Sequence, residues 1–281
     1  MTISILGAGW LGLPLAQKLL QNNYVVKGST TKMEKLATLR AVGIQPFMLN
    51  LTPEPMGIGW DFFLEADVLV INIPPRLERQ EQGFCVAQMV ALTQLMQRTM
   101  PKKIIYVSST SVYPELNRQV FEADVQTPPQ AAASALVEAE NMIQTLPVPT
   151  VILRCGGLMG YDRVPGKYVA GKQQLTTGDI AVNYIHRDDA VGIIVRLIEA
   201  DVSIWNQTYN AVAPVHPTRR DVYNKSCVDF LLELPTYAEP SQPLPFKIVN
   251  SDKITAALPY QFIYPDPLEF LYTGYEQSMP L

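Results

Sequence analysis

The sequence predicts a doubly wound α/β fold, with a mostly parallel sheet and a smaller C-terminal α/β cap. Through residue 154, short β-branched runs alternate with longer helical stretches. Strands that alternate with helices pair in parallel through right-handed crossovers. After residue 213, prolines crowd a segment that holds only short periodic pieces. Because proline removes a hydrogen-bond donor and interrupts helices and sheets, this segment predicts an irregular cap.

The predicted strands share short apolar runs rich in β-branched side chains: Ile3–Leu6, Tyr24–Lys27, Gln45–Leu49, Asp67–Ile73, Ile104–Ser108 and Thr150–Arg154. The run at 67–73 is almost unbroken, which is typical of a strand covered on both faces. The helical patterns lie between the strands: Leu13–Gln21, Lys32–Ala41, Glu78–Arg98 and Ala131–Leu146.

Composition excludes several classes of protein. With 48% hydrophobic and 17% charged residues, the chain of 281 residues suits one large globular domain or one large and one small. A net charge of -4 offers no basic surface for nucleic acid. No apolar run approaches the ~20 residues that cross a bilayer, and no signal peptide opens the chain, so we expect a cytoplasmic protein without a membrane partner.

No metal site is expected. The three cysteines, Cys85, Cys155 and Cys227, are widely separated and odd in number, so they match neither a disulfide framework nor a metal-binding spacing. The two histidines, His186 and His216, do not complete a ligand set with them.

A glycine-rich loop, Gly7-Ala8-Gly9-Trp10-Leu11-Gly12, connects the first predicted strand to the first predicted helix. In a G-x-G-x-x-G loop the first glycine allows a tight turn, the second admits a pyrophosphate, and the third brings the helix close to the sheet. The helix N-terminus then offers N–H groups to the phosphates. A turn without a ligand is the alternative, but the strand–loop–helix context favours dinucleotide binding by Gly7, Gly9, Trp10, Leu11 and Gly12.

The end of the second strand bears on which dinucleotide is bound. An NAD site usually carries Asp or Glu ~20 residues after the loop, for the ribose 2′-hydroxyl. Here Ser29, Thr30, Thr31 and Lys32 occupy this stretch, with no acidic residue before Glu34. Hydroxyls and a cation can hold a 2′-phosphate, so the sequence favours NADP over NAD. Alternatively, 30–32 is a plain helix N-cap with a solvated lysine.

Three further segments follow the glycine loop in a characteristic order: Ile105–Pro114, Leu153–Gly160 and Ile185–Ala190. Together they resemble the extended short-chain dehydrogenase/reductase superfamily, the group of nucleotide-sugar epimerases and dehydratases. The resemblance implies a Rossmann domain with a C-terminal substrate cap, and NADP or NAD lying across the carboxyl edge of the sheet. It assigns residues 1–213 to the NAD(P)-binding domain, with 155–176 contributing to the cap, and residues 214–281 to the substrate-binding cap.

The resemblance breaks at the acid/base pair. Family enzymes carry Tyr-x-x-x-Lys on a helix, and these positions fall on Ala132 and Leu136 here. The chain is therefore similar to an atypical branch of the family. Ser109 matches the catalytic serine of the family, although it is equally interpreted as a hydroxyl that ends a buried strand. Tyr113 and Tyr161 are candidates to replace the missing acid.

The resemblance places other residues near the cofactor and the substrate. The expected cofactor contacts are Asn50, Asn72, Ile73, Pro74, Ser108 and Gly157. A strand stop is the alternative for the segment at 72–74. His186 and Arg219 are expected on the substrate side. For His186 we favour a structural tie between a helix start and the cap, and for Arg219 a surface helix start is the equal alternative. Arg154 is expected to be an ion-pair partner.

Two functions follow as hypotheses. The first is an NADP-dependent oxidoreductase, epimerase or dehydratase with altered acid/base residues, acting on a polar small molecule such as a nucleotide sugar. The second is a non-catalytic NADP-binding sensor or regulator. The missing Tyr and Lys favour the second, and the Ser109 segment with a full-length cap favours the first, which we prefer. Small apolar residues on the helix at 131–146 are compatible with a homodimer.

Overall fold

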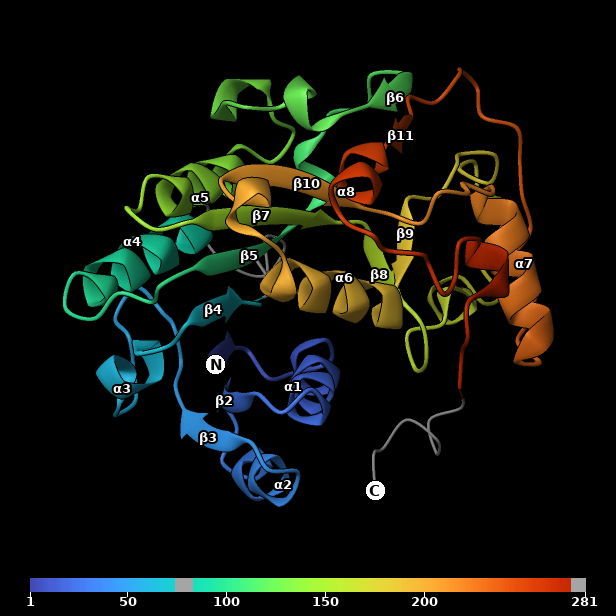
Figure 1. Ribbon diagram of the computed structural model, residues 1–281. Helices are drawn as coiled ribbons and strands as arrows, with labels where there is room; N and C mark the ends of the chain where they lie inside the picture. The colour runs from blue at the N-terminus through green and yellow to red at the C-terminus, as the bar shows by residue number, and fades with distance from the viewer. Residues whose placement is uncertain (74–82, 274–281) are drawn as a thin grey trace.

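The computed structural model describes residues 1–73 and 83–273. Seven parallel strands form its central sheet, in the order β10-β7-β5-β4-β1-β2-β3 (Figure 1). Their bounds are β1 (Thr2–Leu6), β2 (Val25–Thr30), β3 (Gln45–Met48), β4 (Val68–Ile71), β5 (Ile104–Ser109), β7 (Thr150–Cys155) and β10 (Gln207–Ala211). Every pair of neighbours in this sheet is parallel, so the doubly wound parallel sheet predicted from the sequence is confirmed.

Helices cover both faces of the sheet, and each face has its own apolar core. One face carries α1 (Gly12–Gln21), α2 (Lys35–Ala41) and α6 (Arg187–Glu199), whose Leu15, Leu39 and Ile194 are buried together. The other face carries α3 (Trp60–Leu64), α4 (Phe84–Met96) and α5 (Ser134–Gln144), whose Phe63, Leu92 and Ile143 are buried together. The two layers hold the strands rigidly, so the loops at the strand ends are firmly positioned.

Smaller elements complete the described chain. Two short parallel sheets pair β6 (Arg118–Val120) with β11 (Lys247–Val249), and β8 (Gly157–Met159) with β9 (Tyr184–His186). Two further helices are α7 (Arg219–Asp229) and α8 (Asp252–Ala257). Short 3₁₀ turns span Thr110–Val112, Glu122–Asp124, Pro128–Gln130, Pro165–Tyr168, Val202–Ile204 and Pro267–Glu269.

The proline-rich segment after residue 213 is more ordered than the sequence predicts. It contains the helix α7, and Ile254 of α8 and Leu258 pack into the same core as α1 and α6. Part of this segment therefore stabilises the main sheet. The domain boundaries at 213 and 155–176 stay predictions.

The second helix begins three residues later than predicted. The Thr30 hydroxyl accepts a hydrogen bond from the Lys32 N–H at 3.1 Å, which forms a turn ahead of the helix. The N-cap of α2 is Glu34, without a side-chain capping bond. Thr30 and Thr31 therefore do not cap α2. The turn instead holds Thr31 and Lys32 at the end of β2.

Within residues 1–73 and 83–273, no helix has the length and apolar character needed to cross a membrane. Over the same residues, no group of three or more His, Cys, Asp or Glu side chains is placed to hold a metal ion.

Candidate functional site

The chain changes direction across the sheet at β1. It runs outward from β1 to β2 and β3, and then returns to β4 on the other side of β1. The loops after β1 and β4 therefore separate at the carboxyl edge, which creates the crevice where open α/β sheets bind ligands. Asn72 lines this divide, and its side-chain amide donates to the Gly7 carbonyl at 3.0 Å.

The three glycines of the loop are required for different reasons. Gly7 has a φ of +103°, and a Cβ added there would lie 2.3 Å from the Asn72 carbonyl oxygen. A Cβ at Gly12 would lie 2.2 Å from the Gly7 carbonyl oxygen. A Cβ at Gly9 would meet no atom within 4 Å. The protein itself excludes side chains at Gly7 and Gly12, whereas the backbone at Gly9 faces open space from which a ligand can approach.

Helix α1 begins at the end of this loop. Its N-cap, Leu11, makes no side-chain capping bond, and the first turn contains no acidic residue. The first N–H groups of a helix lack intrahelical partners and carry partial positive charge. An anion at Gly9 would therefore be stabilised without competition from a carboxylate of this turn.

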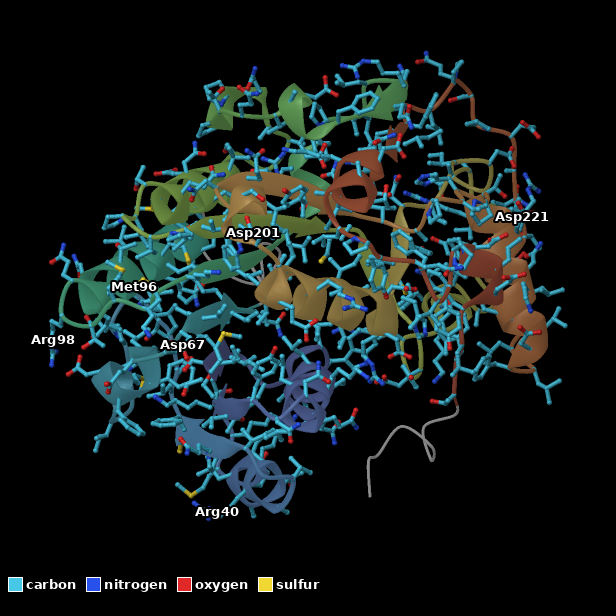
Figure 2. The ribbon with its side chains drawn as sticks, in the orientation of Figure 1. Arg40, Asp67, Met96, Arg98, Asp201 and Asp221 are labelled. Atoms are coloured by element: carbon cyan, nitrogen blue, oxygen red, sulfur yellow. The ribbon has the colours of Figure 1, made fainter. Side chains whose placement is uncertain are left out.

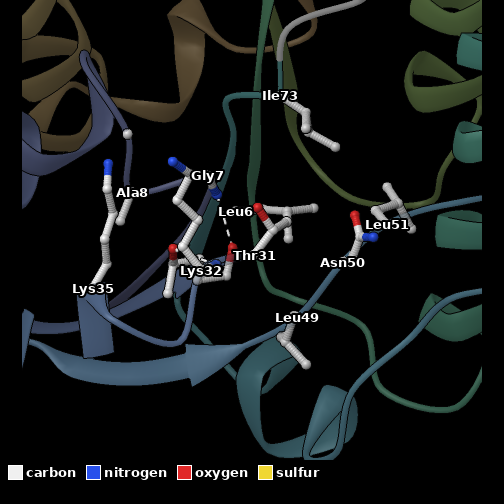
Figure 3. A pocket seen from close by; sticks show the side chains of 13 residues that line it. Leu6, Gly7, Ala8, Thr31, Lys32, Lys35, Leu49, Asn50, Leu51 and Ile73 are labelled. Carbon is white, nitrogen blue, oxygen red and sulfur yellow. Dashed lines mark hydrogen bonds between the residues drawn. The ribbon is translucent and has the colours of Figure 1, made fainter. Parts of the chain in front are cut away.

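A pocket opens beside the loop, between the ends of β1, β2 and β3 (Figure 3). Its lining consists of Leu6, Gly7, Ala8, Gly9, Ser29, Thr30, Thr31, Lys32, Lys35, Leu49, Asn50, Leu51 and Ile73. In Figure 3 the side chains of Lys32 and Lys35 stand on one side of the pocket, and Asn50, Leu51 and Ile73 stand on the other. The structure thus brings together predicted cofactor residues from four separate stretches of the chain.

Lys35 is a lining residue that the sequence analysis missed. It lies at the start of α2, three positions after Lys32. Residues three apart lie near each other in helical geometry, and this spacing was the available signal. Among the described residues, the pocket wall therefore carries two ammonium groups and no carboxylate.

Several expected cofactor residues serve mainly to hold the loop. Ser29 is buried, and its hydroxyl accepts from the Gly7 N–H at 2.9 Å. The Asn72 amide is engaged with Gly7 as described above. Leu11 is buried in the core, so it can offer a ligand only its backbone. The indole N–H of Trp10 donates to Asp162 at 2.6 Å. Pro74 lies outside the described residues.

On the other half of the sheet, polar side chains form a buried network. Arg154 pairs with Glu140 at 2.6 Å, and both side chains are almost fully buried. The Ser108 hydroxyl donates to Glu140 at 2.5 Å. The Tyr113 hydroxyl accepts from Arg154 at 2.9 Å and donates to Asn210 at 2.7 Å. The expected ion-pair role of Arg154 is confirmed.

Tyr113 requires a correction. Its side chain is 0% exposed, and burial raises its pKa to about 12. Both hydrogen-bonding positions of its hydroxyl are used within the protein. The geometry therefore gives Tyr113 a structural role instead of the catalytic one expected from the sequence. Ser108, which was expected to contact the cofactor, likewise uses its hydroxyl to bind Glu140.

Ser109 stands at the carboxyl end of β5. Its oxygen accepts from the Ser111 N–H at 3.1 Å, which leaves the hydroxyl proton available to a ligand. Ala132 precedes α5, and Leu136 is 1% exposed within an apolar cluster. Neither of these two positions, to which the family resemblance assigns the acid/base pair, carries a titratable group.

His186 is fully enclosed and both of its ring nitrogens are engaged. Nδ1 accepts from the Asp188 N–H at 3.2 Å, and Nε2 lies 3.1 Å from the Leu271 carbonyl, to which it donates. A Cβ at Gly160 would lie 2.4 Å from Nε2. Burial lowers the pKa of this histidine, so the ring is neutral. This geometry agrees with the structural tie favoured from the sequence, and it leaves no nitrogen for a substrate.

Aromatic residues lie near Gly157, one of the expected cofactor contacts. A Cβ at Gly157 would lie 2.7 Å from the ring of Tyr184, so this ring packs directly on Gly157. Burial, followed by the nearby Tyr223, raises the pKa of Tyr184, and the nearby Arg219 opposes this shift. The hydroxyl of Tyr272, also close by, is buried without a hydrogen-bond partner in the described chain. The sequence analysis did not single out Tyr184, although this residue directly precedes the segment Ile185–Ala190.

The strand order, the glycine crevice and the C-terminal elements define a Rossmann-like fold of the epimerase and short-chain dehydrogenase type. UDP-glucuronic acid 4-epimerase from Bacillus cereus, solved with UDP-glucuronic acid and NAD, matches with a TM-score of 0.76, 18% identity and coverage of 96% and 97% of the two chains. A functionally unknown conserved protein from Silicibacter pomeroyi matches with a TM-score of 0.73, 20% identity and 95% coverage of each chain.

At the level of sequence, no family model matches the chain. Protein YeeZ of Escherichia coli strain K12 is 33% identical to it over 269 residues, which cover 95% of this chain and 97% of YeeZ. The chain therefore belongs to the family of Protein YeeZ.

Proposed function

We propose that this protein binds a nicotinamide dinucleotide, NADP in preference to NAD, and acts with it as an oxidoreductase or epimerase on a polar small molecule such as a nucleotide sugar. The observation that carries the proposal is the crevice at the carboxyl ends of β1 and β4, where the backbone at Gly9 faces open space and α1 presents its N-terminus. The B. cereus epimerase of similar fold was solved with NAD, which supports this class of ligand.

The residues of the crevice fit such a dinucleotide. Its pyrophosphate would lie over Gly9 and the N-terminus of α1, and its adenosine half would occupy the pocket beside Asn50 and Leu51. The ribose 2′-phosphate of NADP would meet Thr31, Lys32 and Lys35. Hydroxyl and ammonium groups bind phosphate, whereas the carboxylate typical of NAD sites would repel it.

When bound, a nicotinamide dinucleotide supplies hydride transfer, so the protein contributes orientation and proton handling. Ser109, at the end of β5, can donate its hydroxyl hydrogen bond to a substrate oxygen. Ser109 pairs in register with Cys155, the last residue of β7. Gly157 lies two residues further along the chain, at the start of β8, and pairs in register with Tyr184 of β9. Burial raises the pKa of Tyr184, so its phenol stays protonated at neutral pH and would not serve as a phenolate base.

A second function, non-catalytic sensing of NADP, is favoured by one observation. Leu136 occupies the position of the family lysine and is buried in an apolar cluster, and Ala132 occupies that of the tyrosine. A chain with this arrangement can bind the cofactor without the usual proton relay. The homodimer and the cytoplasmic location stay predictions.

Binding is tested by thermal unfolding with NADP, NADPH, NAD and NADH side by side. A ligand at a hundredfold excess over its Kd adds ~2.7 kcal/mol to the free energy of unfolding. We expect the largest shift in melting temperature with NADP or NADPH. Equal shifts for NAD and NADP would remove the argument from Lys32 and Lys35, and the absence of any shift would overturn the proposed function.

Catalysis is tested by following NADPH absorbance with a panel of sugar nucleotides and carbonyl compounds. We expect turnover that falls by ~10²–10⁴ in Ser109→Ala, the usual range for a positioned proton-transfer group. Ser111→Ala is the matched control, since Ser111 engages Ser109 through its backbone N–H and not its hydroxyl. Tight binding of NADPH without turnover in the unmodified protein would favour the sensor.

A further inference from the structure

Two arginines converge on the glycine loop from the segments that follow β8 and β9. Trp10, which comes directly after Gly9, is their meeting point. The guanidinium carbon of Arg163 lies 3.9 Å from the centroid of the Trp10 ring, and that of Arg187 lies 5.2 Å from the same centroid. Arg187 also stacks on Tyr161 at 3.6 Å. Stacking on aromatic rings uses the flat face of a guanidinium and leaves its N–H edge free.

These two guanidinium groups are poorly compensated by the protein. Among the described residues, Arg163 has no carboxylate oxygen within the 4.0 Å of an ion pair. Among the same residues, Arg187 has a carboxylate oxygen within this distance only on Asp188, 3.8 Å from its Nε. This Nε is buried without a hydrogen-bond partner in the described chain. Burial lowers the pKa of Arg163, the nearby Tyr168 and Asp162 oppose this shift, and the charge of Arg187 adds to it. Because arginine keeps its charge at neutral pH, the unfavourable environment calls for an anion.

The acidic side chains of this region are engaged elsewhere. Asp162 accepts from the Trp10 indole at 2.6 Å, and Asp188 accepts from the Tyr161 hydroxyl at 2.7 Å. Asp189 accepts from the Tyr260 hydroxyl and from the N–H groups of Ile263 and Tyr264. Asp162 and Asp188 thus fix the two aromatic rings on which the arginines stack.

Helix geometry adds to the positive potential. Arg187 is the first residue of α6, and α6 packs against α1 (Figure 1). Both helices start at the carboxyl edge of the sheet, but only the first turn of α1 is free of acidic residues, whereas Asp188 and Asp189 in the first turn of α6 offset its partial positive charge. A ligand phosphate over Gly9 would therefore face the N-terminus of α1 and the two guanidinium groups that stack on Trp10.

We propose that Arg163 and Arg187, held on Trp10, form a clamp for the diphosphate group of the ligand bound at the glycine loop. The clamp rests on the proposed function for the identity of that ligand, a dinucleotide. A guanidinium fork binds two phosphate oxygens at once, and charge-assisted bonds of this kind are the strong ones. The glycine loop then binds the diphosphate through backbone N–H groups, and the arginines bind it from the outer side.

The test is isothermal titration calorimetry with NADP, inorganic pyrophosphate and adenosine. The proteins are the unmodified chain, Arg163→Ala, Arg163→Lys and the control Arg40→Ala. Arg40 is an exposed arginine in the last turn of α2 (Figure 2). We expect Arg163→Ala to weaken binding of NADP and pyrophosphate by about ten- to a hundredfold, with adenosine and the Arg40 variant unaffected. Arg163→Lys keeps the charge without the fork, so its loss is intermediate.

The outcomes separate the clamp from the proposed function. NADP binding that is equally tight in Arg163→Ala and Arg40→Ala would overturn the clamp and leave the proposed function standing. Pyrophosphate binding that depends on Arg163, in a protein that binds no dinucleotide, would support the clamp and overturn the proposed function. Melting temperatures establish that each variant is folded. If Arg163→Ala is unfolded, equal affinities of Arg163→Lys and the unmodified chain would overturn the clamp.

Discussion

The two halves of the sheet use their polar groups in different ways. Around β1, β2 and β4, the backbone at Gly9 and the side chains of Lys32 and Lys35 face a pocket. Around β5, β7 and β10, the side chains of Arg154 and Tyr113 are bonded within the protein and sealed from water. The difference is one of degree, because Ser29 and Asn72 in the first half also bond within the protein and Ser109 in the second half keeps its hydroxyl proton available. The difference indicates that the first half keeps polar groups available for a ligand, whereas the buried network of the second half stabilises the fold.

The largest expected effect comes from breaking the sealed half. Arg154→Ala would leave the Glu140 carboxylate buried without its partner, and such a loss destabilises a protein by about 3–5 kcal/mol. Denaturant unfolding measures the change. The control is Arg98→Ala, whose partner Asp61 is exposed, so about 0.2–1 kcal/mol is expected. Similar losses in both variants would mean that the two halves do not differ as described.

Two glycines of the open half sharpen the comparison. Gly7→Ala forces a left-handed backbone and a clash with Asn72, so it should destabilise the fold by at least roughly 1–2 kcal/mol. Gly9→Ala meets no neighbour, so the stability of the ligand-free protein should change by about 0.5 kcal/mol or less. The added methyl group of Gly9→Ala would nevertheless occupy the space through which a ligand phosphate approaches the backbone. Melting temperatures are measured with and without NADP. Only Gly9→Ala should combine a normal melting temperature without NADP with the loss of the increase caused by NADP. An increase that is retained in Gly9→Ala would refute the role of Gly9.

A smaller effect is expected from pH. Burial lowers the pKa of His186 and His216 below the value of 6.5 for an unfolded histidine. Below about pH 6.5 the unfolded chain binds more protons than the folded one. The free energy of unfolding that the two neutral histidines contribute above that pH is therefore lost as the pH falls toward their pKa values in the folded protein. Denaturant unfolding between pH 7.5 and 5 should show this decline. In His186→Asn the decline should be shallower, and an unchanged slope would contradict a buried neutral ring.

The smallest effect concerns the choice of dinucleotide. Lys32→Ala and Lys35→Ala each remove one exposed ammonium from the pocket wall, which corresponds to about a two- to fivefold loss of NADP affinity. NAD affinity should stay the same, because NAD lacks the 2′-phosphate. Lys18→Ala, an exposed lysine in the last turn of α1, is the control. Equal losses for NAD and NADP would show that the two lysines do not read the 2′-phosphate.

Sequence by itself determined the alternation of strands and helices and the glycine loop at 7–12. These are local features, because side-chain periodicity and the conformational freedom of glycine act within a few residues. It also located Thr31, Lys32 and Asn50, since each follows a strand and parallel strands end at one edge.

Tertiary structure alone decided which side chains meet. Trp10 and Asp162 are hydrogen-bonded although they lie 152 positions apart. Tyr113 and Asn210 share a buried hydrogen bond, so a tyrosine that the sequence offered as an acid became part of the core. Such contacts depend on how the crossovers fold back over the sheet, and the free energy of burial is a property of the assembled core and not of any short segment.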